Sequence, residues 1–149
     1  MSVRLQEGPF DAGAELSRFS AGLKTSGAVV SFTGVCRGTG ADGAPLAAMT
    51  LEHYPGMAEA ELARIEAEAR ARWPLEDSFL LHRFGRLVPG DPIVLVLAAS
   101  EHRAAAFEAA SFMMDFLKTQ APFWKREETA AGTGWVDARE ADEAARDRW

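Results

Sequence analysis

The chain has 149 residues, of which 48% are hydrophobic and 26% are charged, and its formal net charge is -6. The length and composition suit one globular domain with a real core, spanning residues 1–149. The acidic balance argues against a nucleic-acid partner, which calls for a basic face. The longest apolar run, residues 93–99, is far shorter than the ~20 residues of a membrane span, and the N-terminus carries no apolar signal segment. We therefore expect a cytoplasmic protein without a membrane partner.

Six stretches have the β-branched, aromatic or alternating character of strands. They are residues 3–6, 28–35, 46–54, 78–84, 93–99 and 123–127. A further turn is expected at Gly132-Thr-Gly134, before Trp135 and Val136.

Three helices and a weakly helical, charged tail accompany these strands. Asp11 can cap a helix that extends to about Ser20, with Leu16 and Phe19 as its buried positions. A second helix covers residues 57–73 and carries Met57, Leu62, Ile65 and Ala69 on one side. The third and longest has Ser100 as its expected N-cap and Glu101 in its first turn, and Pro122 ends it. Strands that come partly in neighbouring runs and partly around helices predict an α+β fold with a mixed or antiparallel sheet packed with helices.

The loop after the second strand contains Gly38-x-Gly40-x-x-Gly43, a spacing typical of dinucleotide-binding loops. That chemistry needs a helix N-terminus directly after the loop to hold the pyrophosphate. Pro45 and another strand follow instead, so the sequence argues against a dinucleotide site.

Three cations gather after the long helix in a chain that is otherwise acidic. Lys118, Lys125 and Arg126 have no acid between them, which suggests an anionic ligand. Lys118 alone has an alternative explanation, because basic residues at a helix end complement the macrodipole and the free carbonyls. Lys125 follows a proline and two aromatic residues, and it has no such explanation.

Five segments, in the right order, resemble the large, catalytic subunit of molybdopterin synthase. They are SFTGVCR (31–37), LEHYPGM (51–57), HRFGRLVPGD (82–91), SEHRAAAFEA (100–109) and MDFLKTQAPFWKRE (114–127). The resemblance runs from about Gly27 to Trp149. It implies an α/β-hammerhead-like fold, a homodimer, and a heterotetramer with a small ubiquitin-like sulfur-carrier subunit at each end. It implies no cofactor and no metal ion.

The activity implied by this resemblance is sulfur transfer. Two sulfurs from the carrier's C-terminal Gly-Gly thiocarboxylate convert cyclic pyranopterin monophosphate (precursor Z) to molybdopterin. Both reactants are anions, which suits guanidinium groups that bind phosphate in paired hydrogen bonds. A lysine in a partly desolvated, cation-rich pocket is suited to act as a general acid or base.

The resemblance also implies the site residues. Lys118 and Lys125 are the expected catalytic groups, and Phe32 and Met114 are the expected apolar walls. The substrate-binding positions are Val35, Cys36, Arg37, His102, Arg103, Lys118, Lys125, Arg126 and Glu127, with Arg37, His102 and Arg103 expected to hold the phosphate.

Helix geometry constrains how these residues come together. Arg103 and Lys118 are 15 residues apart, so on one helix they lie roughly 22 Å apart along the axis, at ~1.5 Å per residue. A pterin monophosphate does not bridge that distance. We therefore expect each pocket to combine Lys118 and Lys125 of one subunit with His102 and Arg103 of the other, and Arg139 in the tail is a further candidate to reach across.

Four other polar residues invite roles that the sequence does not favour. Cys36, the only cysteine, excludes a disulfide within the chain and multi-cysteine zinc sites, and we expect it to pack as a small hydrophobe rather than act as a nucleophile. His53 and His82 lie in strand-like segments and are expected to be hydrogen-bonded structural histidines, not metal ligands. Ser100 is explained by a helix cap better than by a catalytic triad.

The main alternative to a transferase is a non-catalytic, anion-binding regulatory α+β domain that uses the same basic pocket. The aromatic pair Phe123-Trp124 is expected to line a groove for the partner under the transferase hypothesis and to be buried in the core under the alternative. The lysines discriminate between the two, because a pure binder tolerates Lys125→Arg whereas proton transfer does not.

Overall fold

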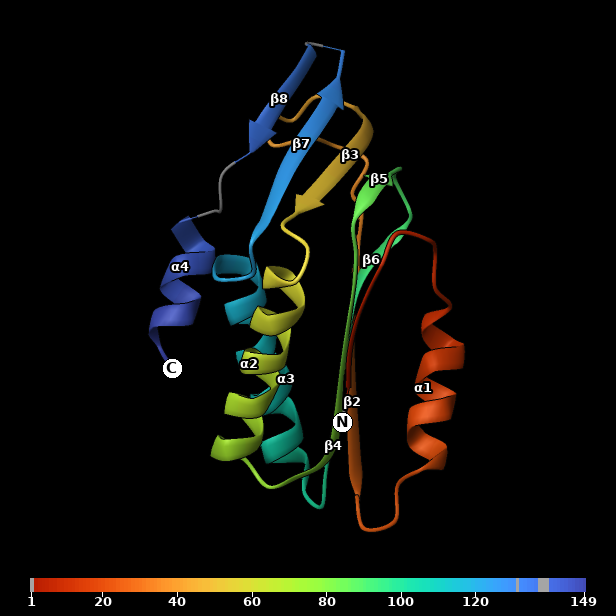
Figure 1. Ribbon diagram of the computed structural model, residues 1–149, viewed down its shortest axis with the longest axis vertical. Helices are drawn as coiled ribbons and strands as arrows, with labels where there is room; N and C mark the ends of the chain where they lie inside the picture. The colour runs from red at the N-terminus through yellow and green to blue at the C-terminus, as the bar shows by residue number, and fades with distance from the viewer. Residues whose placement is uncertain (1, 131, 137–139) are drawn as a thin grey trace.

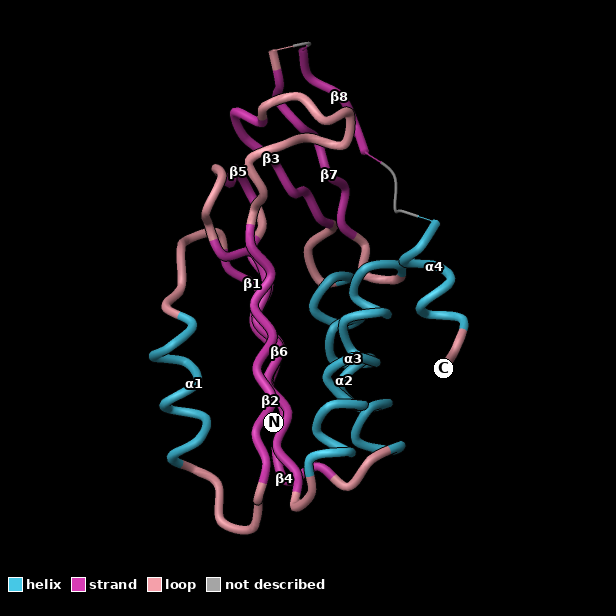
Figure 2. The backbone as a smooth tube through the Cα atoms, turned by 180° about the vertical axis from the view of Figure 1, so that it is seen from behind, coloured by secondary structure: helices cyan, strands magenta, loops and turns pink. Residues whose placement is uncertain are grey.

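The structure is a computed structural model that describes residues 2–130, 132–136 and 140–149. Figure 1 shows one sheet along the long axis, with α1 (Ala12–Ala21) on one face and α2 (Met57–Arg72) and α3 (Arg103–Thr119) on the other. A second sheet lies at one end of the molecule, and α4 (Glu140–Asp147) packs beside α3 (Figure 2). The predicted α+β class with mixed and antiparallel sheets is confirmed. That residues 1–149 form a single domain stays a prediction.

The long sheet has the strand order β1-β4-β6-β2. Its strands are β1 (Ser2–Gln6), β4 (Leu75–Arg83), β6 (Pro92–Ser100) and β2 (Ala28–Val35), and β1 runs parallel to β4 while the other pairs are antiparallel. Helices cover both faces of β6, which explains why the sequence shows a continuous apolar run there rather than an alternating one.

The hydrophobic core is divided by this sheet. Leu80, Val96, Phe112 and Met113 belong to the cluster between the sheet and the helices α2 and α3. Phe79, Leu81, Leu95 and Leu97 face α1, where Leu16 and Phe19 pack against them as half-buried side chains. Asp11 accepts a hydrogen bond from the Ala14 amide at 3.0 Å, so the predicted cap of α1 is confirmed.

The second sheet has the order β5-β3-β7-β8 and is antiparallel throughout. It consists of β3 (Leu46–His53), β5 (Gly85–Leu87), β7 (Phe123–Thr129) and β8 (Gly132–Val136). The predicted turn at Gly132-Thr-Gly134 is wrong, because these residues pair with Thr129, Glu128 and Glu127 as the start of β8. The loop with three glycines leads into β3 and not into a helix, as the argument against a dinucleotide site requires.

The long helix begins later than the sequence predicts. Ser100 is the last residue of β6, where it pairs with Ala28 and Leu75, and its hydroxyl donates to the Pro74 carbonyl at 2.7 Å. The N-cap is His102, and α3 ends at Thr119. The predictions that Ser100 caps this helix and that Glu101 lies in its first turn are therefore wrong.

In α2, Leu62, Ile65 and Ala69 are fully buried as predicted, but Met57 is 59% exposed. Met57 is the first residue of the helix and lies beyond the edge of the face that packs on the sheet. None of the described helices is long and apolar enough to cross a bilayer.

Candidate functional site

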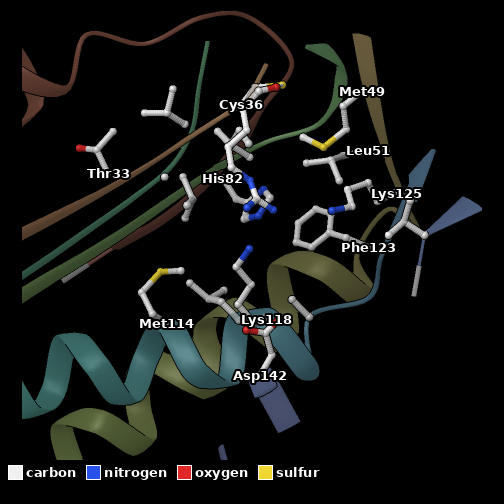
Figure 3. Close-up of a pocket in the computed structure, with 18 of the residues that line it drawn as sticks. Thr33, Cys36, Met49, Leu51, His82, Met114, Lys118, Phe123, Lys125 and Asp142 are labelled. Carbon is white, nitrogen blue, oxygen red and sulfur yellow. Dashed lines mark hydrogen bonds between the residues drawn. The ribbon is translucent and has the colours of Figure 1, made fainter. Parts of the chain in front are cut away.

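A cavity of about 460 Å³ lies between the end of α3, the end of β2 and the inner face of the second sheet (Figure 3). Its lining comes from β2, β3, β4, β6, α3, β7, β8 and α4, as well as from the loop after β2. Segments far apart in the sequence thus meet at one place, which is typical of a binding site.

Three cations from separate elements surround this cavity. Lys118 comes from the last turn of α3, Lys125 from β7, and Arg37 from the loop after β2. Figure 3 shows Lys118 leaving α3 toward the middle of the cavity, with Lys125 entering from the side of β7. The carboxylates of Glu127 and Asp142 also line it. The arrangement is suited to an anionic ligand with proton-transfer groups beside it.

Strand alternation decides which residues of β7 enter the cavity. Phe123, Lys125 and Glu127 line it, whereas Arg126 does not. The guanidinium of Arg126 lies on the other face of β7, 5.8 Å from the centre of the Trp135 ring. The predicted substrate-pocket position of Arg126 is therefore not supported within this chain, because adjacent strand residues point to opposite faces.

Glu127 connects the glycine-rich loop to the part of the cavity that contains Lys125. Its Oε1 accepts a hydrogen bond from the Ala41 amide at 2.8 Å, and its Oε2 lies 4.0 Å from Nζ of Lys125. The side chain is 11% exposed. This carboxylate thus fixes the loop and faces a lysine at the same time.

Phe32 and Met114, the expected apolar walls, line the cavity, and so do Val35 and Cys36, which are expected as substrate-binding positions. Cys36 is buried, and burial, followed by the negative charges of Asp91 and Glu127, raises the pKa of its thiol. A thiol with a raised pKa is a poor nucleophile, which agrees with a packing role.

The two strand histidines have different surroundings. His82 lines the cavity, stacks on Phe123 with ring centres 4.1 Å apart, and has Nδ1 2.7 Å from the Arg83 carbonyl oxygen. His53 packs against Phe84 at 4.5 Å, and its buried Nδ1 has no hydrogen-bond partner among the described residues. The prediction of a hydrogen-bonded histidine therefore fits His82 and is wrong for Nδ1 of His53. In the described part of the chain, no three His, Cys, Asp or Glu side chains gather as a metal site would require.

His102 and Arg103 lie at the opposite end of α3 from the cavity. Both are exposed, and His102 borders a shallow hollow together with Thr25 and Glu76. The separation of roughly 22 Å expected from helix rise applies, because both ends belong to one uninterrupted helix. Within one chain the lysines do not meet His102 and Arg103, the pair expected to hold the phosphate. Arg139, the other cross-subunit candidate, lies outside the described residues.

The lysines are less shielded than the sequence analysis expects. Lys118 is exposed, and the side chain of Lys125 is 33% exposed. Desolvation of these amines therefore requires something that covers the cavity, such as a substrate or another chain.

Besides several apolar and backbone contributors, sequence reasoning missed two titratable residues of the cavity, Asp142 and His82. Asp142 comes from α4, and no local pattern in the charged tail indicates that this helix reaches the cavity. His82 is expected from the sequence to be a structural histidine, yet it lines the cavity. The signal that points to it is its place in the segment HRFGRLVPGD, one of the five that carry the family resemblance.

Comparisons with known proteins agree with this geometry. Residues 5–120 match the family described as MoaE protein. The molybdopterin synthase catalytic subunit of Cereibacter sphaeroides is 54% identical, over 100% of both chains. The solved MoaE structure from Burkholderia ambifaria is 47% identical with a TM-score of 0.84, covering 99% of this chain and 97% of that one. The complex of subunits 1 and 2 of molybdopterin-converting factor from Helicobacter pylori has a TM-score of 0.75 over 92% of this chain and 91% of that one; at 18% identity, it shows a shared fold.

The class defined by this fold and cavity is that of the MoaE proteins, and the chain belongs to this family. Its curated relatives are catalytic subunits of molybdopterin synthase, an enzyme of molybdenum cofactor biosynthesis. The resemblance found in the sequence is thereby confirmed.

Proposed function

We propose that this protein catalyses the transfer of two sulfurs to precursor Z, giving molybdopterin, with the C-terminal thiocarboxylate of a small ubiquitin-like carrier as the donor. The observation that carries the proposal is the cavity in which Lys118, Lys125 and Arg37 converge from three elements of a MoaE-family chain. A phosphate and a thiocarboxylate are both anions, and the three converging cations offer each of them a charge-assisted partner.

The roles of the residues follow from where they lie. Lys118 and Lys125 are close enough to the middle of the cavity to donate or accept protons as the carbon–sulfur bonds form. Arg37, at the mouth, is suited to hold an anionic group through its planar fork. Phe32 and Met114 supply apolar walls against which a pterin ring can pack.

The active form we propose is a homodimer with one carrier on each subunit, working in the cytoplasm. The exposure of both lysines supports this, because a carrier tail that enters the cavity would exclude water from them. The exposed pair of His102 and Arg103 would complete the cavity of the other subunit. The Helicobacter pylori fold relative is itself a complex of two different subunits.

A reconstituted assay tests this function. It combines the protein, a thiocarboxylated carrier and precursor Z, with the dithiolene product as the readout, and it compares wild type with Lys118→Ala, Lys125→Ala and Lys125→Arg. We expect product from wild type and little from any of the three folded variants. Full activity of Lys125→Arg would show that only the charge matters there, and no product from wild type would favour the non-catalytic anion-binding domain.

A further inference from the structure

His82 is half-buried in the wall of the cavity, and its hydrogen bond to the backbone fixes which ring nitrogen carries the hydrogen. Its Nδ1 lies 2.7 Å from the carbonyl oxygen of Arg83. A carbonyl oxygen only accepts, so Nδ1 carries the hydrogen of this bond. In an uncharged imidazole the other nitrogen, Nε2, is then a bare acceptor.

The surroundings keep this ring uncharged at neutral pH. Burial, chiefly, lowers the pKa of His82 to about 4, and the charge of Lys118 and the proximity of His53 act in the same direction. The stacked Phe123 ring, 4.1 Å away and inclined by 15°, covers one face of the imidazole. Among the residues that the structure describes, the other charged groups that line the cavity are Arg37, Lys125, Glu127 and Asp142.

The ring also faces the lysine that the proposed function depends on most. Figure 3 shows the Lys118 amine directed from α3 toward His82, which belongs to β4 and lies on the opposite wall of the cavity. The effect of the Lys118 charge on His82 is consistent with this proximity. Because the other nitrogen of His82 bonds to the backbone, Nε2 is the atom left to accept from a donor in the cavity.

We propose that His82 is a positioning residue for Lys118, which holds the lysine amine in the cavity through a neutral acceptor. A carboxylate in this place would also orient the amine, but it would form an ion pair and cancel the charge that attracts the anionic reactants. A neutral imidazole orients the amine and leaves the net charge of Lys118 intact. The Arg83 carbonyl and the Phe123 stack fix the ring, so the acceptor itself is preorganised.

The physical part of this proposal can be tested on the isolated protein, without any substrate. The ¹⁵N chemical shifts of the His82 ring report which nitrogen carries the hydrogen and the pH at which the ring becomes charged. We expect Nδ1 protonated and Nε2 bare from pH 8 down to about pH 5. In Lys118→Met we expect the His82 pKa to rise, because a nearby positive charge has been removed. An Nε2-protonated ring, or a pKa that does not respond to Lys118→Met, would overturn the proposal.

The functional part rests on the proposed sulfur transfer and uses a matched pair of variants. In His82→Gln the side-chain amide reaches the position of Nε2 and can supply an acceptor. In His82→Asn the shorter amide reaches only the position of Nδ1. A displaced catalytic group costs about 100-fold, so we expect kcat of His82→Asn to fall by roughly 10- to 100-fold with little change in KM, and His82→Gln to recover most of it.

The outcomes are separable. Equal kcat values for the Gln and Asn variants, at wild-type level or equally reduced, would contradict a positioning role, because the two differ in which nitrogen they replace. A wild type without sulfur transfer would contradict the proposed function, while the ring spectra would still decide whether His82 and Lys118 are coupled.

Discussion

The two ends of α3 carry basic side chains in different surroundings, a cavity at one end and open surface at the other. At the C-terminal end, Lys118 points into a cavity that this chain builds with Arg37, Lys125 and His82. At the N-terminal end, His102 and Arg103 lie on the open surface, with 83% of the His102 side chain exposed. The C-terminal end thus has the cavity, and the N-terminal end has the groups expected to bind phosphate, beside only a shallow hollow. This difference is the reason for our proposal that each end is completed by another copy of the chain.

The two ends are also held in different ways. The cavity end is built from packed rings and side chains, such as the His82–Phe123 stack. The other end is held by a loop: the carboxylate of Glu76 accepts hydrogen bonds from the backbone amides of Lys24, Thr25 and Ser26, and the Gly27 amide donates to the Ser100 carbonyl. Four predictions separate the two ends, in order of expected effect.

The largest effect belongs to the cavity end. Positioned acid–base groups contribute about 10²- to 10⁴-fold, so we expect Lys118→Ala to lower kcat by that factor with the fold intact. Lys118→Arg keeps the charge but not the proton chemistry, and we expect it to remain inactive. Single-turnover kinetics with thiocarboxylated carrier measures both. Near-wild-type activity of Lys118→Ala would contradict a catalytic role for Lys118 and for the cavity in which it lies.

Arg103→Ala tests the exposed end. Losing one charge-assisted contact to a phosphate costs ~1.5–3 kcal/mol, which corresponds to roughly a 10- to 100-fold fall in kcat/KM for precursor Z. The free energy of unfolding should not change, because Arg103 is exposed. Steady-state kinetics and urea unfolding check the two halves of this prediction. An unchanged kcat/KM would leave the exposed end without a role in the reaction.

A pH-dependent loss of stability is expected at the cavity end. The pKa of His82 is lowered to about 4 in the folded protein, so the unfolded chain binds the proton first as the pH falls. This contribution to stability is present above the ordinary histidine pKa of ~6.5 and is lost as the pH falls through about 4. Between pH 7 and pH 5 we expect wild type to lose about 2 kcal/mol more than His82→Gln in urea unfolding. If the free energies of unfolding of wild type and His82→Gln fell by the same amount between pH 7 and pH 5, His82 would not titrate as described.

The smallest effect is expected at the exposed end, from Glu76. Hydrogen bonds, first that of the Lys24 amide, lower the pKa of Glu76 to about 2, so its contribution is present above the unfolded value and is lost as the pH falls toward about 2. In Glu76→Ala we expect faster hydrogen exchange at the amides of Ser26 and Gly27, with no change at Phe123. Faster exchange at both ends would show that they are not independent.

Much of this arrangement can be predicted from the sequence. Six of the strands, the three main helices and the Asp11 cap follow from periodicity and local propensity and agree with the structure to within a few residues, whereas β5 and the start of β8 are not predicted. The distance argument on Arg103 and Lys118 needed only helix rise. These properties depend on residues close together in the sequence, so they can be predicted from the sequence alone.

What failed depends on distant neighbours. Ser100 looks like a helix cap, but pairing with Ala28 and Leu75 keeps it in β6. Gly132 looks like a turn, but Thr129 pairs with it across β7 and β8. The role of His82 depends on the stack with Phe123 and on α3 across the cavity, and nothing within the strand that carries His82 indicates either.

Subunit complementation tests most directly whether one subunit's cavity uses the other subunit's Arg103. The Lys118→Ala and Arg103→Ala proteins, each of low activity on its own, are unfolded together, refolded as mixed dimers and assayed for sulfur transfer. If the two residues act across the dimer, half of the dimers are hybrids with one intact site of two, and about a quarter of wild-type activity returns. The matched control mixes Lys118→Ala with Lys125→Ala, which lie in the same cavity, and should stay inactive. No recovery in the first mixture, with hybrid dimers shown to form, would contradict the shared site.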